Sequence, residues 1–284
     1  MSLITAQERP AGLSAIIIGR NEAANLPRCL GALGGVVDEI VYVDTGSTDD
    51  SAQIAESSAA RVFHRPWDDD FSAAKNHAIA QAKFRWLLSL DCDEELVPHS
   101  ATNLILKEWR ANLDSPGAIV RIENIMGDSA QRVPQNALRL FLNDDRIRFQ
   151  NPIHEDVSGS IYRHWPQTPL PRLPITILHH GYAAGRNQEK LQRNMEILGK
   201  WADAEPDYPF AQYKYGKNLL HVGRAQEAWR YLQRAVTLIN NDAQPATYAF
   251  LDALVEDYRE AAQLLGIKEK VPLRLIEALR LQDR

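Results

Sequence analysis

The chain of 284 residues is 45% hydrophobic and 24% charged, which is the composition of an ordinary globular protein. This length accommodates one large domain, or a domain of medium size with a smaller appendage. The formal net charge of -5 gives no electrostatic reason to expect a nucleic acid partner. No apolar run approaches the roughly 18 residues of a membrane span, and the first residues lack the order of a secretory signal. We therefore expect a cytoplasmic protein in which Cys29 and Cys92 are free thiols.

Four short stretches with strand character alternate with helical patterns in the N-terminal part of the chain, and the first and the last are apolar runs typical of a buried strand. They cover residues 13–19, 39–43, 61–65 and 86–90. Helices are expected after residues 20–22, after the capping residues 44–50, and over 68–83. Strands that alternate with helices imply right-handed crossovers, so we predict an α/β fold with a doubly wound, mostly parallel sheet.

The alternation changes after a predicted helix at 100–113 and a strand at 118–125. Further short runs with strand character are separated by Asn, Asp, Pro and Gly, and they cover 137–142, 147–149 and 175–178. We interpret this region as a mixed, partly antiparallel extension of the same sheet. The proline-rich segment 166–174 is expected to be a rigid surface connector, or a loop that covers a cleft.

From residue 187 onward the sequence has a helical pattern. Residues 210–238 fit one tetratricopeptide-type repeat, in which Gly216 stands at the small position of the first helix. A single repeat cannot bury its hydrophobic face alone, so it must pack against neighbouring helices or against the sheet. We therefore predict an α/β domain over 1–185 and a small helical region over 186–284. The helical region either docks a protein partner or acceptor, or only stabilises the chain.

The apolar run at 86–90 ends in the acidic sequence Asp91-Cys92-Asp93-Glu94-Glu95. In open α/β sheets, ligands bind outside the carboxyl ends of the strands. Side chains two residues apart on an extended chain point the same way, so Asp91 and Asp93 can share one hard cation. The same acids are equally typical of a turn that caps the helix expected next.

The first two predicted strands also end in polar residues. Asn21 and Glu22 follow the first strand, and Asp44 and Thr45 follow the second. Parallel strands bring these loops to the same edge of the sheet as Asp91. Considered singly, Asn21 is also a common helix cap and Asp44 a common turn former.

Together these motifs resemble a known family. The chain is similar to family 2 glycosyltransferases of the GT-A fold, in the bacterial branch with a tetratricopeptide-like C-terminal tail. The resemblance is carried by six motifs in the family's order, at 16–22 (IIIGRNE), 43–49 (VDTGSTD), 71–76 (FSAAKN), 86–95 (WLLSLDCDEE), 153–155 (IHE) and 179–182 (HHGY). It implies a nucleotide-sugar donor, with a UDP-sugar as the first choice, and inversion at the anomeric carbon.

The resemblance also assigns roles to individual residues. It implies Mn2+ or Mg2+ as cofactor, held by Asp91, Asp93 and His179. The implied donor-binding residues are Asn21, Glu22, Asp44, Thr45, Lys75, Asn76, Asp91 and Arg139. Many relatives have a second acid where this chain has Thr45, and that acid contacts the base, so the nucleobase stays open here.

The base that deprotonates the acceptor hydroxyl is expected in the acidic pair after His154. Glu155 follows the Ile-His pair as it does in the family, and Asp156 is the second candidate. An inverting single displacement needs one carboxylate on the acceptor side and no covalent nucleophile on the enzyme.

Two other functions compete with this interpretation. A sugar nucleotidyltransferase shares the sheet and the paired acids, but usually has a Gly-rich basic loop after the first strand, which residues 19–22 are not. A non-catalytic scaffold would use the helical tail to bind a partner.

The acceptor stays open among a lipopolysaccharide core or other surface glycan, a lipid carrier and a protein. A membrane-borne acceptor would be met peripherally at the inner face of the membrane.

Overall fold

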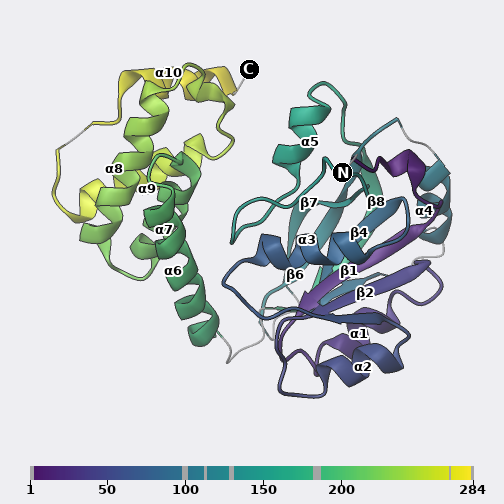
Figure 1. Ribbon diagram of the computed structural model, residues 1–284. Helices are drawn as coiled ribbons and strands as arrows, with labels where there is room; N and C mark the ends of the chain where they lie inside the picture. Colours follow the sequence, from purple (N-terminus) through teal and green to yellow (C-terminus); the bar gives the residue numbers. More distant parts are fainter. Residues whose placement is uncertain are drawn as a thin grey trace. The chain divides into compact units, whose positions relative to one another are not determined.

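The computed structural model describes residues 3–97, 102–111, 114–127, 131–181, 187–268 and 270–282. The chain divides into two compact units, Met1–Arg186 and Asn187–Arg284, and each unit has its own hydrophobic core (Figure 1). Among the described residues, no helix has the length and apolar character needed to cross a membrane.

The first unit is built on a sheet with the strand order β3-β2-β1-β4-β7-β6-β8-β5. Its strands are β1 (Leu13–Gly19), β2 (Glu39–Asp44), β3 (Arg61–His64), β4 (Trp86–Asp91), β5 (Glu94–Leu96), β6 (Gly117–Ile125), β7 (Arg132–Leu142) and β8 (Arg172–His179). The first four strands are parallel, and β7 then joins β4 in the antiparallel sense. The predicted parallel half with a mixed extension is confirmed.

The helices of this unit cover both faces of the parallel half (Figure 1). They are α1 (Leu26–Gly31), α2 (Ser51–Ser57), α3 (Phe71–Gln81), α4 (Thr102–Ala111) and α5 (Ser158–His164). The crossovers through α1 and α2 lead outward to β2 and β3, whereas the crossover through α3 returns to β4 on the other side of β1. The direction of winding therefore reverses between β1 and β4, where ligands bind in such sheets.

Apolar strands buried on both faces hold the parallel half together. In β4, Trp86, Leu87, Leu88 and Leu90 are all buried, and each such side chain contributes about 1.5–3 kcal/mol. The Trp86 ring lies 4.0 Å from the ring of Trp109 on α4, which covers the start of the strand. Strands buried on both faces read as continuous apolar runs, which is why the sequence predicts them well.

The extension departs from the predicted elements in three places. Residues 147–149, predicted as a strand, form none; Ile147 and Phe149 are buried in the core, and the nearest bridge joins Gln150 to Asp156. The short edge strand β5 and the helix α5 are additional elements. The end of the proline-rich segment, predicted as loop, belongs to β8, and residues 100–101 and 112–113 of the predicted fourth helix lie outside the described residues.

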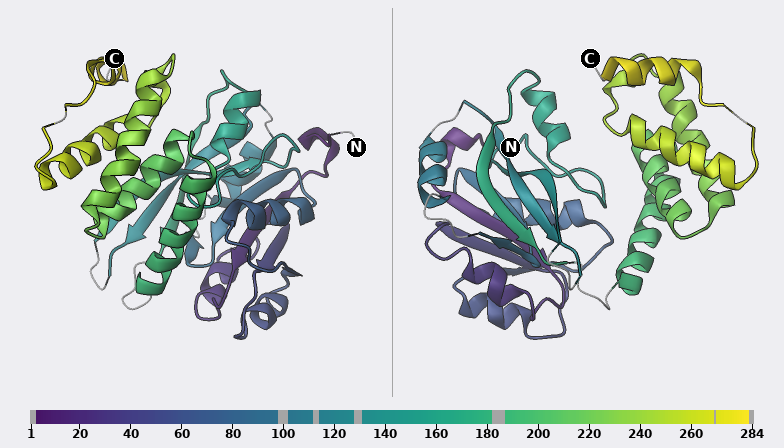
Figure 2. Two further views of the ribbon diagram at one scale, coloured as in Figure 1. Left: turned by 60° about the vertical axis from the view of Figure 1, so that its left-hand side comes forward. Right: turned by 180° about the vertical axis from the view of Figure 1, so that it is seen from behind.

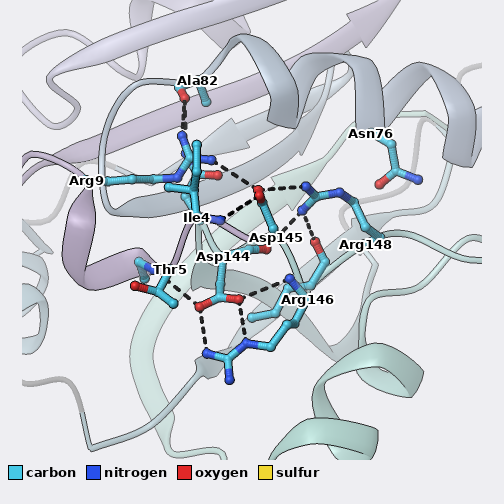
Figure 3. Close-up of polar contacts among 12 residues, drawn as sticks. Ile4, Thr5, Arg9, Asn76, Ala82, Asp144, Asp145, Arg146 and Arg148 are labelled. Carbon is cyan, nitrogen blue, oxygen red and sulfur yellow. Dashed lines mark hydrogen bonds and ion pairs between the residues drawn. The ribbon is translucent and has the colours of Figure 1, made fainter. Parts of the chain in front are cut away.

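The N-terminal residues are tied to the chain that leaves β7 (Figure 3). The backbone N–H of Ile4 donates to Asp145 Oδ2 at 2.8 Å, and that of Ala6 donates to Asp144 Oδ2 at 3.2 Å. Arg146 Nε donates to Asp144 Oδ1 at 2.8 Å. The last residue of β7 pairs with the first residue of β4. This cluster therefore lies at the amino ends of the parallel strands, opposite the carboxyl ends that carry Asp44 and Asp91.

The second unit consists of helices, shown from further sides in Figure 2. They are α6 (Asn187–Ala204), α7 (Pro209–His221), α8 (Ala225–Asn241), α9 (Leu251–Leu264) and α10 (Leu273–Gln282), with a 3-10 turn at Pro245–Thr247. Gly216 lets α7 and α8 approach closely, since a Cβ at this position would lie 2.9 Å from Leu232 Cγ. Leu232 and Ala235 are buried between these helices, as the repeat pattern predicts.

Candidate active site

The loops that follow β1 and β2 are joined by hydrogen bonds. Asn21 has a left-handed backbone with φ 56°, and its Oδ1 accepts from the backbone N–H of Thr48 at 2.8 Å. Its own N–H donates to Ser47 Oγ at 3.0 Å, and the N–H of Glu22 donates to Ser51 Oγ at 2.8 Å. These contacts hold both loops in one arrangement at the carboxyl edge of the sheet.

Asp44 and Thr45 are both buried at the end of β2. The Asp44 carboxylate accepts from the N–H of Ser47 at 3.0 Å, and its Oδ2 lies 3.3 Å from His64 Nδ1. The hydroxyl of Thr45 donates to the carbonyl of Gly19 at 3.1 Å, as does its N–H at 2.9 Å. The acid is therefore oriented before any ligand arrives, and Thr45 instead joins β2 to β1.

Asp91 ends β4 between two cations. Lys75 Nζ on α3 lies 3.1 Å from Asp91 Oδ1, and Arg139 on β7 lies 3.2 Å from Asp91 Oδ2. Lys75 also pairs with Glu155 at 2.8 Å, and Arg139 also pairs with Glu94. Two cations thus join three carboxylates from distant parts of the chain.

The charges in this network shift one another's pKa values. Burial works to raise the pKa of Asp91, but Lys75 and Arg139 outweigh it and hold the pKa well below its usual range. Burial works to lower the pKa of Lys75, but Asp91 and Glu155 outweigh it and raise the pKa. For Glu94 burial prevails over Arg139, so its pKa is raised. The cations therefore stay charged at neutral pH, and Asp91 stays ionised.

The two candidate bases, Glu155 and Asp156, have different environments. Glu155 is largely buried on Lys75, whereas Asp156 is exposed. The Asp156 carboxylate accepts from the N–H of Ser158 at 2.6 Å and from its hydroxyl at 2.8 Å, at the first turn of α5. His154 between Ile153 and Glu155 has a left-handed backbone with φ 56°. The chain thus places Glu155 on Lys75 and leaves Asp156 beside the first residue of α5.

Asp93 faces His179, the last residue of β8. Their nearest atoms, Asp93 Oδ1 and His179 Nε2, are 3.5 Å apart, and the carbonyl of Asp93 accepts from the N–H of His180 at 2.9 Å. The other ring nitrogen, Nδ1, lies 2.8 Å from Asn124 Oδ1. The hydrogen bond with Asp93 raises the pKa of His179 above its usual value, against the effect of burial.

Asp93 and His179 have the chemistry and the spacing of a pair of metal ligands. A Cβ at Gly181 would lie 2.5 Å from His179 Nε2 and 2.6 Å from Asp93 Oδ2, so the missing side chain leaves room between the two ligand atoms. An imidazole and a carboxylate suit Mn2+, and Mg2+ is commonly held by one or two carboxylates and phosphate oxygens. Each oxygen of Asp91 instead lies beside a cation, Oδ1 at 3.1 Å from Lys75 Nζ and Oδ2 at 3.2 Å from Arg139. Within the described ranges, no group of three or more His, Cys, Asp or Glu side chains is arranged to hold a metal.

Asn76, implied as a donor-binding residue, is engaged with the backbone. Its Nδ2 donates to the carbonyl of Phe149 at 3.0 Å, and its Oδ1 accepts from the N–H of the same residue at 2.9 Å. This clip holds the segment that leads to Glu155, and it explains why 147–149 needs no partner strand. Tyr182 of the last motif lies outside the described residues.

Three residues of the site were not predicted from the sequence. In the sequence, Glu94 is only one acid of the run 91–95, and His64 lies within the predicted strand 61–65. Asn124 carries no local signal, because its role depends on β6 and β8 being neighbours in the sheet.

Comparison with known proteins adds a second line of evidence. The model of the family described as Glycosyl transferase family 2 matches residues 14–164. A TPR repeat-containing protein of Synechococcus elongatus is 37% identical over 233 residues, which cover 80% of this chain and 57% of that protein. The SPbeta prophage-derived glycosyltransferase SunS of Bacillus subtilis is 24% identical over 255 residues, which cover 84% of this chain and 56% of SunS. The chain thus spans little more than half the length of these relatives.

Among solved structures, the crystal structure of S. aureus TarS 1-349 in complex with UDP-GlcNAc resembles this chain with a TM-score of 0.54. The match covers 91% of this chain and 93% of that one, at 15% sequence identity. At this identity the likeness concerns the fold, and it extends over both units.

Proposed function

This chain belongs to glycosyl transferase family 2, and from that premise we propose that it moves a sugar from a nucleotide-sugar donor to an acceptor hydroxyl by an inverting, metal-assisted displacement. Membership confirms the resemblance seen in the sequence, and the GT-A fold class is confirmed as well. One observation carries the proposal. The ends of β1, β2 and β4 bring acids and amide groups to the point where the winding of the sheet reverses, beside the Lys75 and Arg139 cations.

The donor is proposed to be a UDP-sugar. The TarS fragment that shares this fold was crystallised with UDP-GlcNAc. In this chain the joined loops that carry Asn21, Glu22, Asp44 and Thr45 would line the nucleoside pocket. Thr45 stands where many relatives have an acid that contacts the base, and its side chain instead donates to the carbonyl of Gly19.

We place the divalent ion, Mn2+ or Mg2+, on Asp93 and His179. When bound, this ion supplies electrophilic stabilisation of the charge on the departing diphosphate. Asp91, expected from the sequence as a further ligand, would instead keep Lys75 and Arg139 in position beside the diphosphate. Both cations lie in a buried network, where their charges act more strongly than they would in water.

The proposed transfer is a single displacement. The acceptor oxygen forms a bond to the anomeric carbon while the bond from that carbon to the diphosphate oxygen breaks, and the electron pair leaves with the diphosphate. Glu155 takes the proton of the acceptor hydroxyl, and the anomeric configuration inverts because there is one displacement. Lys75, which contacts both Asp91 and Glu155, sets the distance between the donor side and the acceptor side.

The setting of the reaction is part of the same proposal. The acceptor is a surface glycan, a lipopolysaccharide core, a lipid carrier or a protein, met in the cytoplasm or at the inner face of the membrane. The unit 187–284 is proposed to bind a protein partner or the acceptor, because the Synechococcus elongatus relative, which matches 80% of this chain, has a TPR repeat name.

The test is a calorimetric titration of the chain with UDP, GDP, CDP and dTDP, each with and without Mn2+. We expect saturable binding of UDP that requires Mn2+, and loss of the Mn2+ dependence in Asp93→Ala and in Gly181→Ala, which fills the space between the ligand atoms. Glu256→Ala, which removes an exposed carboxylate from α9, is the matched control and should bind as the wild type does. Failure of every nucleotide to bind would reject the proposal and leave the scaffold role.

A further inference from the structure

We propose that Asn124 is a positioning residue, which sets the imidazole tautomer of His179 and so directs the Nε2 lone pair at the cation beside Asp93. This inference rests on the proposed function, because it concerns the same metal pair. Asn124 itself would not touch the donor or the ion. It would act through the ring that it holds.

The sheet places Asn124 and His179 side by side. They are register partners in the parallel pair of β6 and β8, and Asn124 is 7% exposed. Its Oδ1 lies 2.8 Å from His179 Nδ1, and its Nδ2 donates to the carbonyl of Val133 on β7 at 3.1 Å. Both ends of the amide are therefore in use in a buried position.

The contact with Val133 decides which way the amide points. A carbonyl oxygen only accepts, so the amide end that faces Val133 must be the NH2 group, and the end that faces His179 must be the oxygen. Exchanging the two ends would bring two oxygens together in a buried site. Because Oδ1 is an acceptor, Nδ1 of His179 must carry a proton.

The consequence lies at the other ring nitrogen. In the neutral ring with a proton on Nδ1, the lone pair is on Nε2, which lies 3.5 Å from Asp93 Oδ1 and borders the space beside Gly181. Histidines that bind metals usually donate their other N–H to a fixed acceptor, and loss of that partner costs about 10–100-fold in metal affinity. Asn124 has the position and the chemistry of such a partner.

Two substitutions separate positioning from a merely structural role. Asn124→Leu removes both hydrogen bonds of the amide. Asn124→Asp also loses the donor to Val133, but it keeps an acceptor for the Nδ1 proton of His179. A residue that only braces β6 against β7 would be damaged equally by both changes, whereas a positioning residue would be rescued by Asp.

The experiment has two readouts on the full chain. Nitrogen-15 NMR of the histidine rings, at about pH 9 so that the ring is neutral, reports the tautomer without metal, with His179→Gln to assign the signal. Mn2+ titration followed by electron paramagnetic resonance reports affinity, with and without UDP. We expect the Nδ1–H form in the wild type and in Asn124→Asp. In Asn124→Leu we expect the tautomer to be mixed or reversed and the Mn2+ affinity to fall about 10–100-fold.

The two proposals fail in different ways. A proton on Nε2 in the wild type, or equal Mn2+ affinity in a folded Asn124→Leu, would overturn the role of Asn124. Absence of Mn2+ binding to the wild type, with the Nδ1–H tautomer present, would instead count against the metal-assisted function. Circular dichroism of each variant shows whether it is folded.

Discussion

At the scale of single residues, the acids of the Asp-x-Asp motif have different surroundings. Asp91 is held between Lys75 and Arg139, whereas Asp93 faces His179 across 3.5 Å. The two side chains are close in sequence, yet Asp91 pairs with two largely buried cations, whereas we propose that Asp93 binds the ion. Removing Asp91 would be costly, because it takes one carboxylate partner from each of two largely buried cations.

The proposed base, Glu155, is also tested at this scale. We expect Glu155→Gln to lower the rate of UDP release from UDP-GlcNAc by about 10²–10⁴-fold, because the proton acceptor is lost, while UDP still binds. Asp156→Asn keeps an oxygen for the N–H of Ser158 and should leave the rate largely unchanged. Steady-state rates and calorimetric UDP affinities of both variants check this. Loss of activity in Asp156→Asn alone would make Asp156 the base.

At the scale of elements, backbone contacts position the acidic turn that follows β4. The three-residue strand β5 pairs with β8, so that Glu94 lies opposite His179 and the acidic turn is held against the end of that strand. The carboxylate of Glu94 also accepts from the N–H of Asp91 at 3.0 Å. The turn that carries Asp93 is therefore fixed at both sides.

Two helical glycines, one at a close helix contact and one with no neighbour, allow a matched pair of substitutions. In Gly216→Ala on α7, the new Cβ would lie 3.1 Å from the backbone nitrogen of Leu232, so the helices must separate. We expect a net loss of about 1–2 kcal/mol, because overpacking outweighs the gain in helix propensity. Gly31→Ala on α1 has no atom within 4 Å and should gain up to about 1 kcal/mol. Thermal unfolding that moves in the same direction for both would contradict this.

At the scale of the whole molecule, contacts between distant segments close the first unit. Asp144 and Asp145 bind the N-terminal residues and the arginines that follow β7 (Figure 3). Burial works to raise the pKa of Asp144, but Arg146 and the N–H groups of Arg146 and Ala6 lower it below its usual value. Stabilisation by this carboxylate is therefore present above its unfolded pKa and is lost as pH falls through its folded pKa.

This linkage predicts the acid stability of the chain. We expect the free energy of unfolding to fall between about pH 5 and pH 2, and Asp144→Asn to reduce both that slope and the stability at neutral pH, the latter by about 1–3 kcal/mol. Urea denaturation at several pH values measures both effects. Glu108→Gln, which changes an exposed acid on α4, should stay within about 0.5 kcal/mol of the wild type. An Asp144→Asn variant with the wild-type slope would refute the role of this carboxylate.

Much of the fold follows from local pattern. Apolar runs buried on both faces predicted β1, β2 and β4 to within a residue or two, the alternation with helices predicted the edge strand β3, and the order of motifs indicated the family. The predicted strand at 147–149 was wrong, because buried apolar residues that pair with no neighbouring strand show the same pattern as a strand. Here the side chain of Asn76 bonds to the backbone of Phe149 instead. Short elements such as β5 carry too few residues for a period to show.

The sequence by itself determined the alternating strands and helices, the polar residues at the strand ends and the glycine at the helix contact, because these depend on neighbours along the chain. Only the tertiary structure decided which charges pair. Lys75, Asp91, Arg139 and Glu155 meet because β7 lies beside β4 and the chain before α5 folds back onto α3. Likewise Asn124 meets His179 only through the register of β6 and β8, which no local pattern encodes.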